Sequence, residues 1–291
     1  AVAVNQGTSG TLTLTPASAN NGISVPADAG AITIGAPIAT GAIQTWEVVG
    51  GGANGSSLTV SGAVTIGHVI NKTGAGVLTL SGSNTGSGGL VLAAGTLIIG
   101  NNNALGAGTF SIGAGTTVDT GATAIVNAGT NAQNWNGNFT FTGTNTLSLG
   151  TGAVTMTDNV IATVSAQTLT VGGAIGDGAA TFGLTKSGAG VLALNGANTY
   201  GGLTNLINGT LTLNGANSFS GGFNVTNGNV LVGSATGLGA ASNLIAVGAG
   251  TSVDLQGNAA TIGGLADIAA AGGTFTNTGS AVTLTLGGAV S

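Results

Sequence analysis

The sequence predicts an all-β protein that folds as a parallel β-helix, or β-solenoid, with turns of about 20 residues. Three observations support this prediction. Short segments alternate apolar and polar residues along the whole chain, sequence pieces recur at a regular spacing, and Gly, Asn and Ser fill the gaps between segments. No stretch shows the periodicity of an α-helix.

Each predicted strand is a short run in which one small or polar residue separates two apolar residues, as in a half-buried strand. Tight turns of Gly, Asn and Ser are expected between these runs. In chain order the apolar pairs are Leu12/Leu14, Ile32/Ile34, Leu58/Val60, Val64/Ile66, Leu78/Leu80, Leu90/Leu92, Leu97/Ile99, Phe139/Phe141, Leu147/Leu149, Leu169/Val171, Leu192/Leu194, Leu211/Leu213, Val230/Val232 and Leu284/Leu286.

The repeat is clearest in the second half of the chain. Residues 194–198 recur as residues 213–217, and Asn208-Gly209 recurs as Asn227-Gly228 with the same spacing. One solenoid turn or one pair of hairpin strands would give this period, so the period leaves both open. Stacking is favoured because a single turn cannot bury its apolar side chains, whereas neighbours about 4.8 Å apart can. A chain of 291 residues would then make roughly 14–15 turns.

Residues 1–66 differ in composition from the rest of the chain. The three prolines, Pro16, Pro26 and Pro37, lie there together with Trp46 and the single glutamate, Glu47. Proline is excluded from central strand ladders. We therefore expect residues 1–66 to form a less regular β segment or cap, and residues 67–291 to form the repetitive solenoid.

The two basic residues of the chain occupy the same place in two copies of one motif. Residues 70–81 read Ile-Asn-Lys-Thr-Gly-Ala-Gly-Val-Leu-Thr-Leu-Ser, and residues 184–195 read Leu-Thr-Lys-Ser-Gly-Ala-Gly-Val-Leu-Ala-Leu-Asn. A longer segment, residues 95–119, has a similar echo at residues 228–254. A repeat rather than an active site therefore organises the sequence.

This motif resembles the autotransporter-associated β-strand repeat, also called the passenger-associated transport repeat. The matching positions are Lys186, Gly188, Gly190, Leu192, Leu194, Gly196, Asn198, Tyr200, Gly201, Gly202, Thr204, Gly209, Thr210 and Leu211. Residues 72–97 match less fully, with Thr85-Gly86 where the aromatic residue is expected. The resemblance implies a right-handed parallel β-helix in a large secreted bacterial surface protein, without common catalytic residues. It concerns the exported passenger, and the segment that inserts such proteins into the outer membrane is not recognised in this sequence.

Composition excludes several classes of partner. Charged residues make up 3% of the chain, with two Lys, no Arg and a net charge of −5. Nucleic acid and anionic membrane surfaces both require many cations, so neither is an expected partner. There is no cysteine, which removes disulfides and thiolate metal sites. No apolar run approaches the roughly 18 residues of a membrane span.

No catalytic, cofactor-binding or metal site is predicted. Glycoside hydrolysis needs two neighbouring carboxylates, and the candidates are Asp28, Glu47, Asp119, Asp158, Asp177, Asp254 and Asp267. Asp119 and Asp254 are repeat equivalents, which favours a structural role in a turn. Asp158 and Asp177 are one repeat period apart and could meet on neighbouring turns. His68, the single histidine, is expected on an exposed strand or turn, because a metal site needs several ligands.

Three further features allow two interpretations each. The repeated asparagines, 195/214, 198/217 and 208/227, could stack in hydrogen-bonded ladders or adopt left-handed turn geometry. Threonine rows at 140–146, 210/212 and 283/285 could bind ice, or simply face outward as ordinary strand residues. Trp46, Trp135 and Tyr200 could stack on sugars, but packing in the core or at an edge is favoured.

The leading hypothesis is a non-enzymatic extracellular structural protein that builds a bacterial cell-surface fibre or layer. Its termini would associate head to tail, because the stretch 281–291 is strand-like and carries no charge to protect an edge. The alternative is an autotransporter-type passenger that serves as an adhesin or its stalk and meets surface glycans. A polysaccharide-active enzyme is a more distant alternative.

Overall fold

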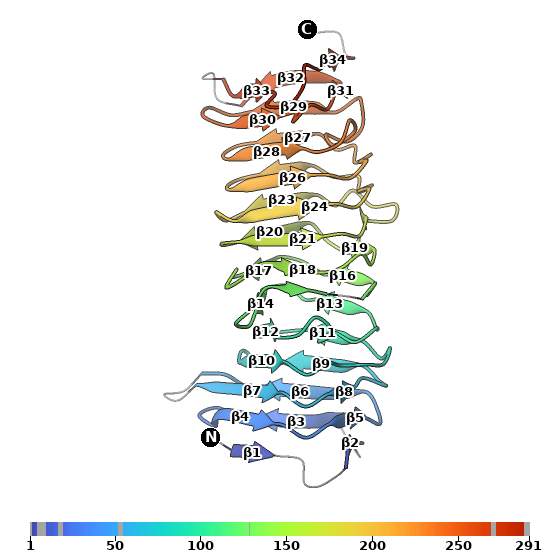
Figure 1. Cartoon of the computed structure of the whole chain (residues 1–291), viewed down its shortest axis with the longest axis vertical. Helices are drawn as coiled ribbons and strands as arrows, with labels where there is room; N and C mark the ends of the chain where they lie inside the picture. The colour runs from blue at the N-terminus through green and yellow to red at the C-terminus, as the bar shows by residue number, and fades with distance from the viewer. Residues whose placement is uncertain are drawn as a thin grey trace. The chain divides into compact units, whose positions relative to one another are not determined.

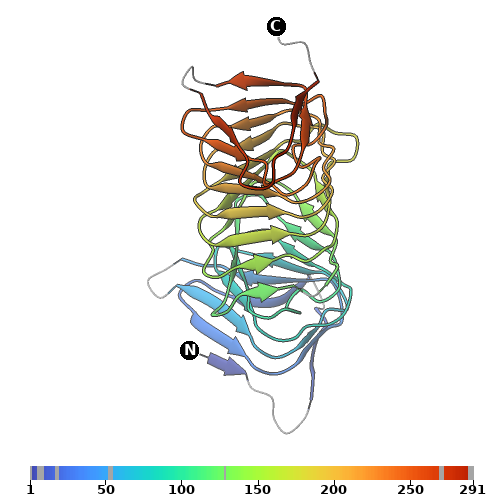
Figure 2. The same cartoon turned by 45° about the horizontal axis from the view of Figure 1, so that its top comes forward.

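The computed structural model describes residues 2–4, 10–16, 20–51, 55–127, 129–268 and 272–287, and every regular element in these ranges is a β-strand. The chain divides into two compact units, residues 1–152 (unit 1) and residues 153–291 (unit 2). The strand pairings described within the units are parallel, for example β10 with β7 and β24 with β26. Figures 1 and 2 show these strands stacked as successive rungs. The predicted parallel β-solenoid is confirmed, and the hairpin alternative is excluded.

Unit 1 contains strands β1 to β18. Their sheets have the orders β1-β4-β7-β10-β12-β14-β17, β16-β13-β11-β9-β6-β3, β2-β5-β8 and β15-β18. The bounds are β1 Val2–Val4, β2 Leu12–Leu14, β3 Asn21–Val25, β4 Gly30–Ile34, β5 Ile38–Thr40, β6 Gln44–Val48, β7 Ser56–Val60, β8 Val64–Thr65, β9 Ile70–Thr73, β10 Val77–Leu80, β11 Leu90–Leu92, β12 Thr96–Ile99, β13 Phe110–Ile112, β14 Thr116–Thr120, β15 Ile125–Val126, β16 Gln133–Trp135, β17 Phe139–Phe141 and β18 Leu147–Ser148.

Unit 2 contains strands β19 to β34. Their sheets have the orders β20-β23-β25-β27-β29-β32, β21-β24-β26-β28-β30-β33, β22-β19 and β31-β34. The bounds are β19 Val154–Met156, β20 Val160–Val164, β21 Thr168–Val171, β22 Ile175–Gly176, β23 Leu184–Ser187, β24 Val191–Leu194, β25 Thr204–Leu206, β26 Thr210–Leu213, β27 Phe223–Val225, β28 Asn229–Val232, β29 Leu244–Val247, β30 Ser252–Asp254, β31 Ala260–Ile262, β32 Gly264–Asp267, β33 Thr274–Thr276 and β34 Leu284–Leu286.

The length of a turn varies along the chain. Leu78 pairs with Leu58 on one side and with Leu97 on the other, so these two turns keep the period of the sequence repeat. Ile32 also pairs with Leu58, which makes that turn several residues longer. On average partners lie about 22 residues apart and the chain makes about 12 turns, so the expected 14–15 turns is an overestimate. The sequence period reports only the most regular turns, because longer turns add residues at loops where nothing repeats.

Inward side chains stack in register from turn to turn and form the core. On β10 the buried residues Leu78 and Leu80 alternate with the outward residues Val77 and Thr79. Because successive strand residues face opposite sides, parallel register places like residues above one another. One such column in unit 1 contains Ile23, Trp46, Lys72, Leu92, Ile112 and Trp135.

The prolines lie beside strands, where they remove no ladder hydrogen bond. Pro26 follows β3 directly, and Pro37 directly precedes β5. The expected boundary at residue 66 and the right-handed coil stay predictions. The C-terminal stretch contains β34 as expected from its pattern, while its residues 288–291 lie outside the described residues.

Candidate functional site

The first candidate site is a cage of backbone carbonyls around Lys72. Lys72 lies on β9 with its side chain directed into the core, and the residue is 0% exposed. Its ammonium donates hydrogen bonds to the carbonyl oxygens of Thr73, Gly74 and Ala94 at 2.8, 2.7 and 3.0 Å. An ammonium has three N–H donors, so all three are used. The first two acceptors lie at and just after the end of β9, and Ala94 lies one turn further along the coil.

Lys186 forms the same cage in unit 2. It lies on β23, is 1% exposed, and donates to the carbonyls of Ser187, Gly188 and Asn208 at 2.8, 2.6 and 3.0 Å. We call each arrangement a lysine cage. In both, the lysine bonds the two residues that follow it and one residue 22 positions later. A lysine cage therefore ties two consecutive turns together.

Burial determines what these lysines can do chemically. Burial lowers the pKa of Lys72 and of Lys186 from 10.5 to about 8. Neither bonds a carboxylate in its cage, and the carbonyls supply only partial negative charge. A general base must reach the proton that it removes, and both ammonium groups face backbone instead. Each ammonium therefore fastens the main chain of two consecutive turns.

Buried asparagines form a second kind of link between turns. Asn198 accepts the N–H of Ile175 at 2.9 Å and donates to Oδ1 of Asn217 at 2.9 Å. Asn217 accepts the N–H of Asn198 and donates to the carbonyl of Gly237. In unit 1, Asn84 accepts from Val64 and donates to Ala104 in the same way. We call these three residues the asparagine bridges.

The asparagine bridges decide between the two interpretations of the repeated asparagines. Asn214 also donates to Asn195 at 2.8 Å, so the pairs 195/214 and 198/217 form ladders. Asn208 differs, because its Oδ1 accepts the N–H of Gly209 in its own turn. Among described residues other than glycine, positive φ occurs at Asn20, Asp28, Gln167 and Gln256, and not at the repeated asparagines. The ladder interpretation is correct for two of the three pairs.

Asp119 and Asp254 hold the neighbouring turn. Asp119 accepts the N–H of Thr144 at 2.9 Å and its hydroxyl at 2.6 Å. Asp254 accepts the N–H and hydroxyl of Thr278 at 3.0 and 2.7 Å. Desolvation would raise the pKa of Asp254, but bonds from Gln256 and Thr278 outweigh it and lower the pKa. Each aspartate therefore ties its own turn to the next one, and the structural role expected for this repeat-equivalent pair stays a prediction.

The other carboxylates also contact the backbone. Asp177 accepts the N–H groups of Phe182 and Gly201, whereas Asp158 accepts that of Asn159. The two carboxylates therefore hold different segments of main chain, and their meeting on neighbouring turns stays a prediction. Among the described residues no three His, Cys, Asp or Glu side chains gather to hold a metal ion. Glu47 accepts from Ser24. The side chain of Asp267 lies outside the described part of the chain. Asp28 lies in the turn between β3 and β4 with φ 60°.

His68 and the aromatic residues lie where the sequence places them. His68 is exposed in a bend, with its N–H donating to the Thr40 hydroxyl at 3.0 Å. Trp46, Trp135 and Tyr200 are each 0% exposed. Tyr200 stacks on Phe219 with ring centroids 5.2 Å apart. These buried rings cannot stack on a sugar from solution.

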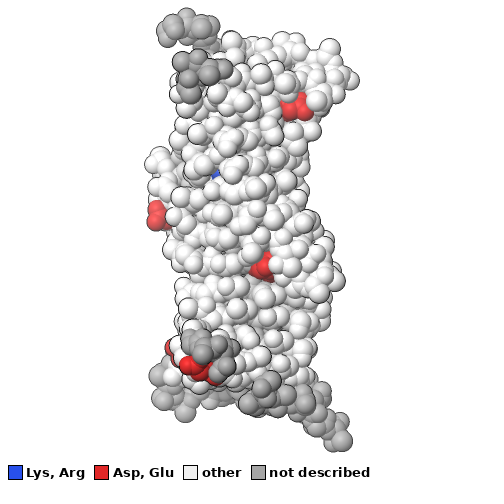
Figure 3. All heavy atoms as spheres, turned by 90° about the vertical axis from the view of Figure 1, so that its left-hand side faces the viewer, with Lys and Arg blue, Asp and Glu red and all other residues white. Residues whose placement is uncertain are grey.

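Thr210 and Thr212 do not form a regular threonine array, whereas Thr285 pairs in register with Thr261. The register neighbours of Thr210 are Val191 and Asn229, and those of Thr212 are Ala193 and Leu231. The surface shown in Figure 3 carries isolated acidic groups and almost no basic atoms. Large aliphatic side chains such as Ile43, Leu203 and Leu244 are exposed as well.

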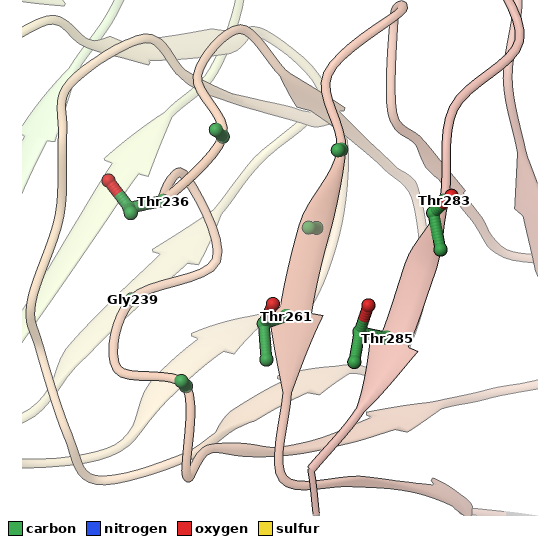
Figure 4. Close-up of a pocket in the computed structure, with 9 residues that line it drawn as sticks. Thr236, Gly239, Thr261, Thr283 and Thr285 are labelled. Carbon is green, nitrogen blue, oxygen red and sulfur yellow. The ribbon is translucent and has the colours of Figure 1, made fainter.

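Unit 2 also contains an open hollow of about 390 Å³ beside β31 and β34. Figure 4 shows Thr261, Thr283 and Thr285 on one side and the turn that contains Thr236 and Gly239 on the other. Its remaining lining residues are Ala235, Ala241, Ala259 and Ala260. The lining has hydroxyl and methyl groups but no ionisable group, so it is suited to a small neutral molecule at most.

The described part of the chain contains no helix of the length and apolar character that crossing a membrane requires. No solved structure matches this chain significantly. Over 95 residues the chain is 38% identical to the "Adhesin BmaC autotransporter" of Brucella suis biovar 1 (strain 1330). This similarity covers 27% of the chain and 3% of the relative, so the chain spans only a small part of that protein.

Both lysine cages lie in segments that match a known repeat family. Residues 70–99, 184–211 and 208–232 match the family described as Passenger-associated-transport-repeat. The first segment contains Lys72 and Ala94, and the second contains Lys186 and Asn208. The resemblance predicted from the motif is thereby confirmed, and this β-solenoid carries passenger-associated transport repeats.

Proposed function

We propose that this chain is part of a secreted bacterial passenger and forms a non-enzymatic β-solenoid that acts as an adhesin or its stalk. The observation that carries the proposal is the lysine cage, which occurs in the repeat segments and binds one turn to the next. The motif residues thus serve the length and rigidity of the coil. A long, rigid coil suits a stalk that holds a binding surface away from the bacterial cell.

The remaining polar groups support a non-enzymatic role. Asp119, Asp177 and Asp254 each accept hydrogen bonds from backbone N–H groups. Catalysis by two carboxylates would need a pair of them free to face a substrate. Turnover of a polysaccharide by the purified chain, lost in Asp177→Asn, would overturn this part of the proposal.

The character of the surface favours a neutral, hydrogen-bonding partner such as a glycan. Charged residues make up only 3% of the chain, and large aromatic rings such as Trp46 are buried. Recognition would therefore rest on hydrogen bonds spread over several turns rather than on ring stacking. An array of neutral glycans, probed with the folded chain, tests this. Binding that is lost on heat denaturation supports the proposal, and no binding to glycans or host cells leaves only the stalk.

Export itself is tested on the bacterium that makes the protein. Antibody against the purified chain should label intact cells or the culture medium. Labelling only after the cells are broken would overturn the secreted location.

A self-associating fibre or layer is a second candidate, favoured by unit 2. Strands β32, β33 and β34 each stand last in their sheets, and Leu265 and Leu286 are 46% and 41% exposed. An unpaired strand edge with apolar neighbours can pair with another chain. Electron microscopy with light scattering tests this directly. Filaments that lengthen with protein concentration support the fibre, and uniform particles of monomer mass exclude it.

A further inference from the structure

We propose that Asn208-Gly209 is a site of spontaneous deamidation that the Lys186 cage promotes. In this reaction the main-chain nitrogen after an asparagine attacks the side-chain amide carbon. The product is a new carboxylate, in a chain that has very few charges. Three observations place the reaction here: exposure, contact between the reacting groups, and a buried cation on the same peptide bond.

Asn208 lies exposed in the turn between β25 and β26, where solvent can reach its amide. Gly209 follows it with φ +80° and has no side chain to block ring closure. The N–H of Gly209 donates to Oδ1 of Asn208 at 2.8 Å. This contact holds the nucleophilic nitrogen beside the carbon that it must attack. Holding the two groups in contact removes part of the entropic cost of bringing them together.

The cation acts on the other end of the same peptide bond. Loss of the Gly209 N–H proton to hydroxide leaves negative charge shared between this nitrogen and the main-chain oxygen of Asn208. That oxygen accepts a hydrogen bond from the Lys186 ammonium at 3.0 Å. A fixed donor aimed at developing charge stabilises it most when the donor is shielded from water. Lys186 therefore makes the peptide nitrogen easier to ionise.

The atoms balance without another reagent. The nitrogen of Gly209 bonds to Cγ of Asn208, and the Cγ–Nδ2 bond breaks as ammonia leaves with a proton from water. Water then opens the five-membered imide at either carbonyl, which gives aspartate or isoaspartate at position 208. Lys186 keeps its proton throughout. The isoaspartate product also adds one carbon to the main chain of the turn that the lysine cage fastens.

The chain contains two positions that test the contribution of the lysine. Asn227-Gly228 repeats the dipeptide one turn later, and there Leu206 takes the register position of Lys186. In unit 1, Ala94 takes the place of Asn208 in the Lys72 cage, so that cage has no amide to react. Native Asn227 reports the rate at an exposed Asn-Gly without the lysine and without the N–H to Oδ1 contact that Gly209 makes. Ala94→Asn isolates the lysine, because it adds an amide to the Lys72 cage.

The experiment is timed peptide mapping by mass spectrometry on the folded chain at neutral pH, with isoaspartate identified by enzymatic methylation. Deamidation at Asn208 should be on the order of tenfold faster than at Asn227, and the two rates should become equal in denaturant. Ala94→Asn should create a second fast site. Equal rates in the folded chain, or a slow site in a folded Ala94→Asn variant, would overturn the proposal.

Discussion

The lysine cages of unit 1 and unit 2 have the same bonds but different acceptor residues. Thr73, Gly74 and Ala94 surround Lys72, whereas Ser187, Gly188 and Asn208 surround Lys186. Because every acceptor is a main-chain oxygen, its side chain is free to vary. The comparison teaches that the register of the coil, rather than the acceptor side chains, builds the site.

The two cages also share a glycine at the same place. Gly95 follows Ala94 with φ +74°, and Gly209 follows Asn208 with φ +80°. A Cβ atom added at either would collide with a cage carbonyl, that of Gly74 or Gly188. At these two glycines the main chain of one turn therefore lies too close to the next turn for a residue with a side chain. A lysine cage requires this close approach to bring its third carbonyl within reach.

Removal of a lysine should have the largest effect. Lys186→Met keeps an unbranched side chain but leaves three carbonyls without their donor, and we expect a loss of about 2–5 kcal/mol in the free energy of unfolding. Lys72→Met should have a similar effect in unit 1. Hydrogen exchange on each variant measures both the size and the location of the loss. Unchanged protection of the Ile207 and Thr210 amides in Lys186→Met would show that the cage is not a fastener.

Substitution of the shared glycine should have a somewhat smaller effect. We expect Gly95→Ala and Gly209→Ala to lose about 2–4 kcal/mol, from left-handed backbone strain together with the clash. Gly115 and Gly178 provide controls, since their φ is also positive, +73° and +68°, but no atom lies within 4 Å of an added Cβ. Their alanine variants should lose only about 1–2 kcal/mol. Equal losses at all four positions in chemical denaturation would show that close approach is unimportant.

Substitution of the asparagine bridges tests whether both units also depend on a buried asparagine for their stability. Asn84→Ala leaves the N–H of Val64 and the carbonyl of Ala104 unpaired. Asn198→Ala leaves the N–H of Ile175 unpaired, while Oδ1 of Asn217 keeps the main-chain N–H of residue 198. We expect each variant to lose about 1–3 kcal/mol in the free energy of unfolding. The exposed Asn195→Ala should stay within about 0.5 kcal/mol of the native chain. Thermal unfolding of the three variants makes the comparison. A loss for Asn195→Ala as large as for Asn198→Ala would contradict the importance of burial.

The sequence allows the fold and the motif to be predicted, but not the cage. The alternation of Leu78 with Thr79, and the short repeat period, depend on local rules and identify stacked parallel strands. The third acceptor, Ala94 or Asn208, is a backbone atom 22 positions from its lysine, and its place depends on the length of each turn. The partners of Asp119 and Asp254, Thr144 and Thr278, likewise lie one turn away and could not be predicted. The echo of residues 95–119 at residues 228–254 identifies only the aspartates as equivalent.

A change of pH should give the smallest effect and compare the two cages directly. Burial lowers the pKa of Lys72 and Lys186 from 10.5 to about 8. Between these values the unfolded chain binds more protons than the folded chain, so the free energy of unfolding should rise as pH increases. The three carbonyls favour the ammonium and oppose burial, so we expect a rise of only about 1 kcal/mol per lysine.

Tyr200 limits the useful pH range. Burial raises the pKa of Tyr200 above its ordinary value of 10.0. Its ionisation therefore favours unfolding at higher pH. Denaturant unfolding between pH 8 and 10 avoids this interference. The double variant Lys72→Met/Lys186→Met should show no rise in this range, and each single variant should show half of it. The free energy of unfolding of the native chain could instead change with pH as little as that of the double variant. This outcome would mean that the carbonyls fully compensate for burial and that both lysines have an ordinary pKa.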